Sequence, residues 1–387
     1  MKLERQPPDP SPDPGSSGRP GAKPRPALLI LPGGGAMGAH QCGAYQAIAA
    51  RVQSGEIELA GIAGASIGAL NGAVIARHLS DRDAGAGALE SLWRDELAFL
   101  PRVFFPLATW YHHSWNSLLT MLLRGNPGLS VPNFMAWNPW GAAFRARAAL
   151  HDPEAMERLI RRYVGSYGPN PGRLPLLLVR AVNAATQQPA IFHSWQEAVE
   201  TRHLMASASI PFLYPLAEID GEAYWDGDLL PYSPLRDLLQ VLRSRPAEGR
   251  IGDYLVIIVD TICGERRRPS SALDLAFQVQ AALLESRADT DEDYAEINNR
   301  YVDFLTAAAE AAGARPASAL GKRIIREHAA ALAANLCRLD VLRIRRQQAL
   351  PFEYISRDLD YSPERLGRLM EQGYDQAERL LAEHVRS

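Results

Sequence analysis

The most constraining feature of the sequence is a run of three glycines between a buried-strand pattern and a helical pattern. Residues 27–31 (ALLIL) predict a short buried strand, and residues 37–52 (MGAHQCGAYQAIAARV) predict a helix with small residues on one side. Gly33, Gly34 and Gly35 therefore lie in a strand–loop–helix turn, where backbone N–H groups converge beside a helix N-terminus. Glycine permits the backbone angles and the close approach that such a turn needs. The pattern predicts an α/β fold with an anion-binding loop.

This loop has three possible roles. Gly33, Gly35 and Gly38 fit the G-x-G-x-x-G pattern, in which the loop holds the pyrophosphate of a dinucleotide. The same backbone could hold the transient oxyanion of acyl transfer. The glycines could also serve only to allow a tight turn.

The next strand–turn–helix segment favours acyl transfer. A dinucleotide site needs an acidic residue at the end of its second strand, and residues 59–66 (LAGIAGAS) end without one. The strand runs instead into Gly64-Ala65-Ser66-Ile67-Gly68, which matches the G-x-S-x-G nucleophile elbow. Short matches occur by chance in glycine-rich chains, but this one follows a strand, precedes a helix and lies downstream of the glycine loop. The context predicts that Ser66 is a nucleophile.

The order of the elements differs from that of an ordinary α/β-hydrolase. That fold places several strands before its elbow and a catalytic histidine late in the chain. Only two strands are predicted before Ser66, and the late histidines His328 and His384 fall in helical patterns. The base is therefore expected elsewhere.

A carboxylate in a predicted β-hairpin is the candidate base. Residues 217–227 (AEIDGEAYWDG) predict a tight hairpin around Gly221. Asp226 ends its second strand, and Gly227 follows. Three motifs thus occur in order along the chain: the glycine loop, the G-x-S-x-G elbow and an Asp-Gly loop.

Together these motifs resemble the patatin-like phospholipase family. The similarity spans residues 27–262 and is carried by GGGAMGAHQCGAYQAI, GASIGALNGA, ASASIPFLYPLAEIDGEAYWDGD and YLVIIVDT. The resemblance implies a three-layer αβα fold with a mostly parallel central sheet. It also implies a Ser–Asp dyad in which Ser66 is the nucleophile and Asp226 its base. The implied oxyanion hole is formed by the backbone amides of Gly33, Gly34, Gly35 and Gly38.

Two positions depart from the family pattern. Met37 stands where the family often has Arg or Lys, so a basic side chain is missing from the loop itself. Asp228 follows Gly227, where the family usually has Gly or Ala. A second carboxylate near Asp226 would tend to raise a pKa in the pair, but we expect Asp228 to point to solvent, as isolated surface carboxylates usually do.

Residues 96–140 hold many large apolar and aromatic side chains interrupted by prolines, among them Trp110, Tyr111, Trp115, Trp137 and Trp140. They form either a second hydrophobic cluster under a long loop, or a lid or acyl-chain wall at a lipid interface, where Trp and Tyr are favoured. On the second interpretation, Met37, Trp110 and Trp115 line an acyl pocket. His112 and His113 are expected to be packed or solvated.

The rest of the chain completes the predicted architecture. Residues 173–194 predict two strands joined by a turn, residues 253–262 predict another buried strand, and the chain from residue 271 onward shows helical spacing. We therefore expect a catalytic domain at 27–265, with the lid or acyl-wall insertion at 96–140, and a helical C-terminal region at 266–387 that packs on it. Residues 1–26, rich in proline, glycine, serine and charge, are expected to be a disordered tail.

Composition narrows the expected partners. The net charge of −3 gives no electrostatic attraction to nucleic acid. Cys42, Cys263 and Cys337 lie far apart, so no metal or disulfide spacing is present and no cofactor is expected. The tail lacks the apolar core of a signal peptide, and no apolar run approaches the length of a membrane span. We expect a cytoplasmic protein with a lipid or acyl-ester substrate and transient contact with a lipid surface.

The sequence therefore predicts a serine-dependent carboxylic ester hydrolase of phospholipase A or lipid-esterase type. Two alternatives are a catalytically weak, lipid-binding homologue and a nucleotide-dependent oxidoreductase that uses the glycine loop.

Overall fold

The computed structural model describes residues 23–106, 109–133, 149–229, 234–244, 253–263, 268–269, 272–314, 337–347, 349 and 353–386. The expected tail falls almost wholly outside these ranges, as do Trp137, Trp140 and His328. In the described helices, no segment has both the length and the apolar character needed to cross a membrane.

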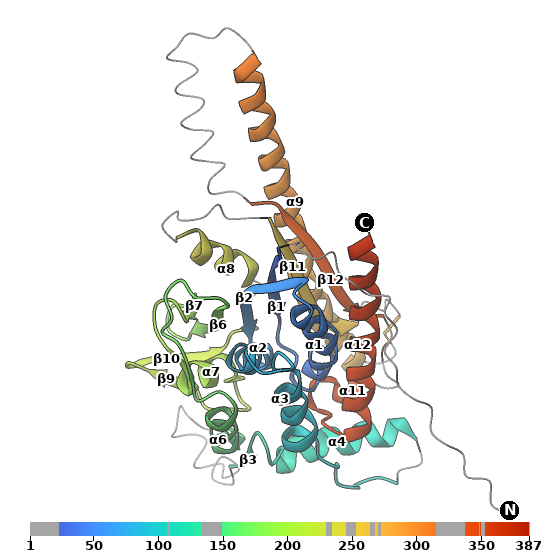
Figure 1. Cartoon of the computed structure of the whole chain (residues 1–387). Coiled ribbons are helices and arrows are strands. Elements are labelled where there is room, and N and C mark those ends of the chain that lie inside the picture. Colours follow the sequence, from blue (N-terminus) through green and yellow to red (C-terminus); the bar gives the residue numbers. More distant parts are fainter. Residues whose placement is uncertain are drawn as a thin grey trace, which may run out of the picture.

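One large sheet organises the fold (Figure 1). In spatial order its main path runs through β12 (Leu339–Arg346), β11 (Tyr254–Cys263), β1 (Arg25–Leu31), β2 (Ile57–Ala65), β6 (Leu176–Asn183), β10 (Glu222–Asp226) and β9 (Ala217–Ile219). The strand β7 (Pro189–His193) also pairs with β6. The strands from β12 to β6 are parallel, and β7, β10 and β9 pair antiparallel with their neighbours. The expected mostly parallel sheet is confirmed.

Short pairs and helices complete the chain. The two-residue strands β3 (Val131–Pro132) and β4 (His151–Asp152) pair with each other, as do β5 (Ser166–Tyr167) and β8 (Val199–Glu200). The helices before β6 are η1 (Gly35–Met37), α1 (Gly38–Gln53), α2 (Ile67–His78), α3 (Ala86–Ser91), η2 (Leu92–Leu97), α4 (Trp110–Arg124) and α6 (Glu154–Tyr163). The later helices are α7 (Thr201–Ser207), α8 (Pro234–Arg243), α9 (Ala272–Ala314), α11 (Glu353–Ser356), η3 (Arg357–Leu359) and α12 (Pro363–Arg386).

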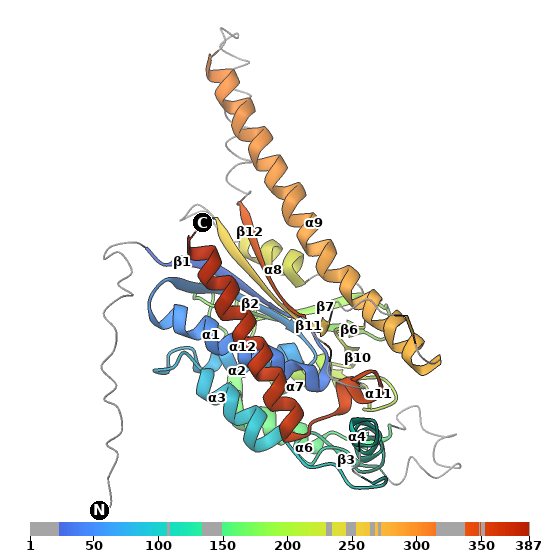
Figure 2. The same ribbon diagram turned by 90° about the vertical axis from the view of Figure 1, so that its right-hand side faces the viewer.

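Helices cover both faces of the sheet, as the three-layer prediction requires. Successive side chains of a strand point to opposite faces, and β1 shows this directly. Leu29 and Leu31 join the core beneath α1, α2 and α12, whereas Leu28 and Ile30 join the core beneath α8. Figure 2 shows α1, α2 and α12 together on one side of the sheet and α8 and α9 on the other.

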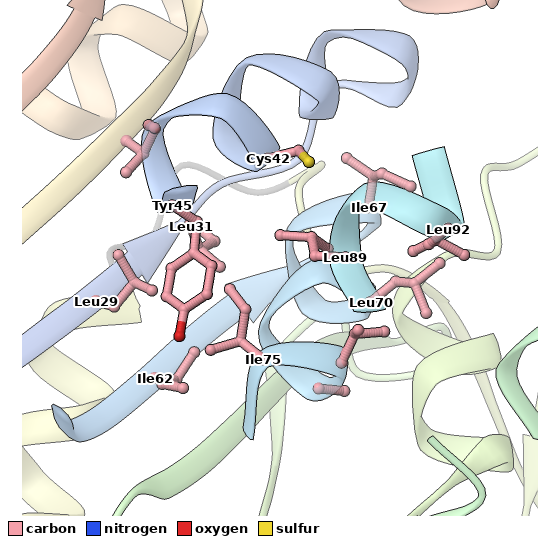
Figure 3. Close-up of a cluster of buried hydrophobic side chains, with 14 of the residues drawn as sticks. Leu29, Leu31, Cys42, Tyr45, Ile62, Ile67, Leu70, Ile75, Leu89 and Leu92 are labelled. Carbon is pink, nitrogen blue, oxygen red and sulfur yellow. The ribbon is translucent and has the colours of Figure 1, made fainter. Parts of the chain in front are cut away.

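The larger core explains the small-residue pattern of the first helix. Figure 3 shows Leu29, Leu31 and Ile62 of the sheet packed near Tyr45 of α1 and Ile75 of α2. The alanines and glycines of α1 bring this helix close to the sheet on one side and to α12 on the other. The helix α12 therefore belongs to the body of the fold, although it lies near the end of the sequence.

The expectation of helix throughout the C-terminal region is wrong for Leu339–Arg346. These residues form β12, which pairs in parallel with β11 along the edge of the sheet. From Leu342 onward every second residue is buried, which is the period of a strand. Buried Arg346 is tolerated there because Glu353 accepts two hydrogen bonds from its guanidinium at 2.7 Å each.

Candidate functional site

The glycine loop and Ser66 lie side by side at the carboxyl edge of the sheet. They follow β1 and β2, which are adjacent and parallel, with Leu31 opposite Gly64. Parallel neighbours end at the same edge, so the loop after β1 and the turn after β2 face the same space. In open α/β sheets this edge is where ligands bind.

Ser66 has the strained geometry of a nucleophile elbow. Its backbone angles are φ 53° and ψ −130°, directly before the first turn of α2. Few non-glycine residues adopt a positive φ, and such strain is concentrated at functional sites. A Cβ on Gly68 would collide with the carbonyl oxygen of Leu31, and one on Gly64 would lie 2.5 Å from that of Gly68. Glycine is therefore required at both positions that flank the elbow motif.

The strand register brings Asp226 next to the elbow. One edge of β6 is occupied by β7, so β2 and β10 must share the other edge end to end. Ala65 lies opposite Arg180 and Asp226 lies opposite Ala181, so β2 and β10 meet at consecutive residues of β6. A step along a strand is about 3.3 Å. Ser66 and the buried Asp226 therefore come from distant parts of the sequence to one point of the sheet.

A third residue, Ser207, connects the two turns. The amide of Ser66 donates to the Ser207 hydroxyl at 2.9 Å, and this hydroxyl donates to the carbonyl oxygen of Arg180 at 2.6 Å. The amide of Gly227 donates to the Ser207 carbonyl oxygen at 3.1 Å. Ser207 ends α7 within the stretch ASASIP, where the sequence pattern alone indicated no role for it. Ser207 contacts Ser66 and Arg180 only in the folded protein, and no local sequence pattern predicts such tertiary contacts.

The Asp226 carboxylate is oriented by the backbone that follows it. Its Oδ1 accepts a 2.7 Å hydrogen bond from the amide of Asp228, and its own amide donates to the carbonyl oxygen of Ser209 at 2.9 Å. Between these two described side chains, the Ser66 hydroxyl and the Asp226 carboxylate, no direct hydrogen bond is formed. Catalytic hydrogen bonds are often longer in the free enzyme and shorten when substrate binds.

Each glycine of the loop is held by a close neighbour. A Cβ on Gly33 would lie 2.9 Å from the Asp228 carboxyl group, and one on Gly34 would lie 2.7 Å from Oγ1 of Thr261. A Cβ on Gly35 would collide with the carbonyl oxygen of Asp358. Within the described chain, the amides of Gly33, Gly34 and Gly35 donate to no other group, whereas the amide of Gly38 donates to the carbonyl oxygen of Gly35 and is not available as the predicted oxyanion donor. The loop is fixed by the Thr261 hydroxyl, which donates to the Gly33 carbonyl oxygen at 2.7 Å, so the unused N–H groups remain available to a ligand.

Asp228 does not have the solvent position that we expected. Its side chain is half-buried and lies against Gly33. A carboxylate therefore stands beside the loop that is the candidate anion site. The physical reason is that Gly33 leaves room for a side chain to approach the loop backbone.

Two arginines of the C-terminal region lie beside Met37, and both are paired with carboxylates. Met37 is buried, and its sulfur lies 3.9 Å from Nη1 of Arg346 and 3.8 Å from Nη2 of Arg365. Both guanidinium groups are buried and share Glu353. Met37 therefore packs in the core against two cations, and it does not line an open acyl pocket.

His40, one turn into α1, shares this environment. It is fully buried, and burial together with the nearby charge of Arg346 lowers its pKa to about 3. The imidazole is therefore neutral at physiological pH. Its protonation would place an unpaired charge in the core between α1 and α12.

The aromatic residues of the 96–140 segment are placed by α4. Trp110 lies under the guanidinium of Arg368, 4.8 Å from its ring centre, and Trp115 lies edge-on to Tyr111. Both tryptophans are half-buried. A cavity of about 560 Å³ between α6, α7 and β9 touches Ser209 but neither tryptophan. The acyl-pocket assignment of Trp110 and Trp115 thus stays a prediction.

Other chemistries find less support in the described residues. No group of three or more His, Cys, Asp or Glu side chains has the arrangement of a metal site in the described part of the chain. His384 hydrogen bonds with Arg25 and lies 2.7 Å from Asp340, so it belongs to a surface ion-pair network. The strand β2 ends in Ala65 without the acidic residue that a dinucleotide ribose requires.

Comparisons with known proteins identify the family of the chain. A model of the patatin-like phospholipase family matches residues 29–239, which include the glycine loop, Ser66 and Asp226. Among solved structures the chain is similar to VipD from Legionella pneumophila, with 13% identity and a TM-score of 0.39 over 94% of this chain and 68% of that one. It is also similar to the type III effector protein ExoU, with 14% identity and a TM-score of 0.22 over 92% and 77% of the two chains. No curated protein sequence matches the chain. Because the family model covers more than half of the 387 residues, the chain belongs to the patatin-like phospholipase family, a family of lipid acyl hydrolases.

Proposed function

We propose that this protein cleaves fatty-acyl esters of lipids, in the manner of a phospholipase A or lipid esterase, with Ser66 and Asp226 as a catalytic dyad. The observation that carries the proposal is the meeting of β2 and β10 on one edge of β6. It brings a strained serine and a buried carboxylate to the same point, beside a glycine loop in which the amides of Gly33 and Gly34 donate to no described group. The family match supports the same reaction class.

In the first half of the reaction, Asp226 accepts the proton of the Ser66 hydroxyl while Oγ attacks the ester carbonyl carbon. The carbonyl π electrons move to oxygen, and the amides of Gly34 and Gly35 stabilise the oxyanion. When the tetrahedral intermediate collapses, the ester C–O bond breaks and the leaving alkoxide takes the proton from Asp226. An acyl-serine remains.

Water completes the cycle. Asp226 takes a proton from water as the water oxygen attacks the acyl carbon, and a second oxyanion forms in the same loop. Its collapse breaks the bond to Oγ of Ser66, which recovers its proton from Asp226 and releases the fatty acid. The N-terminus of α2, directly after Ser66, adds a favourable dipole at the reacting centre.

Two other candidates make different predictions. A nucleotide-dependent oxidoreductase would bind a nicotinamide cofactor, which a fluorescence titration detects. A catalytically weak lipid-binding homologue would bind lipid without turnover. One observation favours it: the carboxylate of Asp228 stands beside Gly33, where it opposes a developing oxyanion.

The test is hydrolysis of a short-chain nitrophenyl ester together with labelling by a fluorophosphonate, which marks activated serines. Ser66→Ala should abolish both, and Asp226→Asn should lower kcat by at least about a thousandfold. Ser54→Ala changes an exposed serine at the end of α1 and should leave both signals unchanged. Full esterase activity in Ser66→Ala, or no turnover by the unchanged protein, would refute the proposal.

A further inference from the structure

A strip of apolar side chains stands out from the surface along α4. The segment just before this helix exposes Leu100 (79%), Val103 (63%), Phe104 (44%) and Phe105 (42%). Tyr111 and Leu123 of α4 are exposed as well. We call these six residues the α4 strip. Soluble proteins rarely expose so many large apolar groups together, and such patches mark interaction sites.

The backbone of the strip is fixed, so its exposure is built into the fold. Fully buried Asn116 accepts hydrogen bonds from the amides of Phe104 and Phe105 at 2.9 and 2.8 Å, and it donates to the Phe105 carbonyl oxygen at 3.0 Å. Thr120, one turn further on, accepts from the amide of Arg102 at 2.8 Å. An asparagine that uses both ends of its amide in this way holds the segment against α4. The two phenyl rings are therefore presented outward from a preformed backbone.

These contacts also set the register of the strip. Residues 104–105 lie beside residue 116 and residue 102 lies beside residue 120, so the segment runs antiparallel to α4. Leu100 is thereby directed toward the C-terminal end of the helix, where Leu123 is exposed. At the other end, the Phe105 ring lies 6.4 Å from the ring of His112, which also contacts Tyr111. The segment thus follows the side of α4 that carries Asn116 and Thr120, and Tyr111 lies beside it through His112.

Charge identifies the kind of surface that the strip fits. Between Glu96 and Asp152 the sequence holds no aspartate or glutamate, although the chain as a whole is acidic with a net charge of −3. Exposed Arg102 and Arg124 lie within this interval, and both stand toward the C-terminal end of α4, because the amide of Arg102 is bonded to Thr120 and Arg124 is the last residue of the helix. Aromatic and aliphatic side chains with arginine at one end, in a segment of the sequence without carboxylates, match an interface of apolar chains and anionic headgroups.

The strip is also connected to the candidate active site. Figures 1 and 2 place α4 beside α11, away from the protruding end of α9. The helix α4 also contacts η3, and η3 contacts the glycine loop through Asp358 at Gly35. A surface bound by the strip would therefore lie near the edge of the sheet where Ser66 and Asp226 meet.

We propose that the α4 strip docks the protein onto membranes that contain anionic lipid, with Phe104 and Phe105 inserted at the level of the headgroups. This inference rests on the proposed function, because docking would bring a lipid acyl hydrolase to its substrate. Docking itself is a binding event that can be measured without turnover.

The test is co-sedimentation of Ser66→Ala protein with vesicles of phosphatidylcholine and phosphatidylglycerol, and with vesicles of phosphatidylcholine alone. Binding should be stronger to the anionic vesicles and should weaken with added salt. The double change Phe104→Ser and Phe105→Ser should lower the partition coefficient at least about tenfold. Phe304→Ser, which alters a 68% exposed phenylalanine on α9, is the matched control and should change binding less than about twofold.

Three results would overturn the docking proposal. The proposal is wrong if the unchanged protein binds no vesicle, or if the Phe304 variant loses as much binding as the double variant. It is also wrong if sedimentation velocity shows a dimer that only the double variant loses, because a second copy would then cover the strip. Hydrolysis of a soluble short-chain ester should be unaffected by the double change, which separates docking from catalysis. Vesicle binding without any ester hydrolysis would refute the proposed function and leave the docking inference standing.

Discussion

The amide of Ser66 donates a hydrogen bond to the hydroxyl of Ser207, at the end of a helix that lies 141 residues further along the chain. The same hydroxyl reaches the carbonyl oxygen of Arg180. Ser207→Ala would leave both groups buried without this partner, at a cost of about 1–3 kcal/mol. Because the loss falls on the turn that holds Ser66, the proposed nucleophile, we expect kcat to fall about 10–100-fold with a smaller change in KM, measured by steady-state ester hydrolysis.

Ser209→Ala is the matched control for this change. Its hydroxyl donates only to the Met205 carbonyl oxygen within α7, and its carbonyl oxygen, which holds the Asp226 amide, is unchanged by the substitution. Equal losses of activity in the two variants would show that Ser207 has no special role at the elbow.

Asp228→Asn should increase activity. The Asp228 carboxylate lies against Gly33 and interacts with the charge of Arg357, and on the proposed mechanism it opposes negative charge that develops in the loop. An asparagine keeps the backbone amide that donates to Asp226 and removes the charge. We expect kcat to rise about fivefold, which corresponds to roughly 1 kcal/mol of electrostatic repulsion.

The comparison for Asp228 is Asp220→Asn, at the exposed tip of the β9–β10 hairpin, which should leave kcat unchanged. A lower kcat in Asp228→Asn would mean that the carboxylate assists catalysis, contrary to our interpretation.

Two glycines of α12 should respond in opposite directions to alanine. A Cβ on Gly373 would collide with the carbonyl oxygen of His40, where α12 crosses α1. A Cβ on Gly367, in the same helix, would meet no atom of the described residues within 4 Å. Gly373→Ala should therefore destabilise the fold by about 1–3 kcal/mol, and Gly367→Ala should stabilise it by up to about 1 kcal/mol through helix propensity.

Thermal unfolding of the two glycine variants provides the measurement. A Gly373→Ala protein at least as stable as the unchanged one would contradict the close crossing of α1 and α12.

Acid should destabilise the protein through His40. Its pKa in the fold is about 3, against 6.5 for an unperturbed histidine, so the unfolded chain binds more protons between these values. The stability contributed by the neutral imidazole is complete above pH 6.5 and is lost as the pH falls toward 3. At pH 5 the loss from this group is about 2 kcal/mol.

His40→Gln should remove this part of the acid sensitivity. Denaturant unfolding at pH 7 and pH 5 should show a smaller difference for the variant than for the unchanged protein. Equal differences would show that His40 is not the group responsible.

Local patterns in the sequence predict most of the local structure at the candidate site. The strand ALLIL, the glycine loop and the G-x-S-x-G turn each depend on neighbours within a few residues, so their geometry follows from composition and spacing. The hairpin that carries Asp226 is predicted for the same reason. The pairing of both β2 and β10 with the same edge of β6 depends on the tertiary structure, so it could be read only from the sheet register.

The misplaced elements share a physical cause. The sequence of β12 suggests a helix because one of its buried positions is the charged residue Arg346. Burial of this charge is possible only because Glu353 pairs with it in the folded protein. The position of Asp228 follows from space beside Gly33, and the arginines at Met37 come from 309 and 328 residues away. Single-sequence patterns do not report such distant partners.

The position of β12, α11 and α12 has a consequence for synthesis. The glycine loop is translated early, but the residues that fix it, including Asp358, are translated more than three hundred residues later. A growing chain on the ribosome carries the serine and the aspartate long before the loop is held in place. Lipid cleavage should therefore begin only after this last part of the polypeptide has emerged, so that partly made chains do not attack the membranes around them.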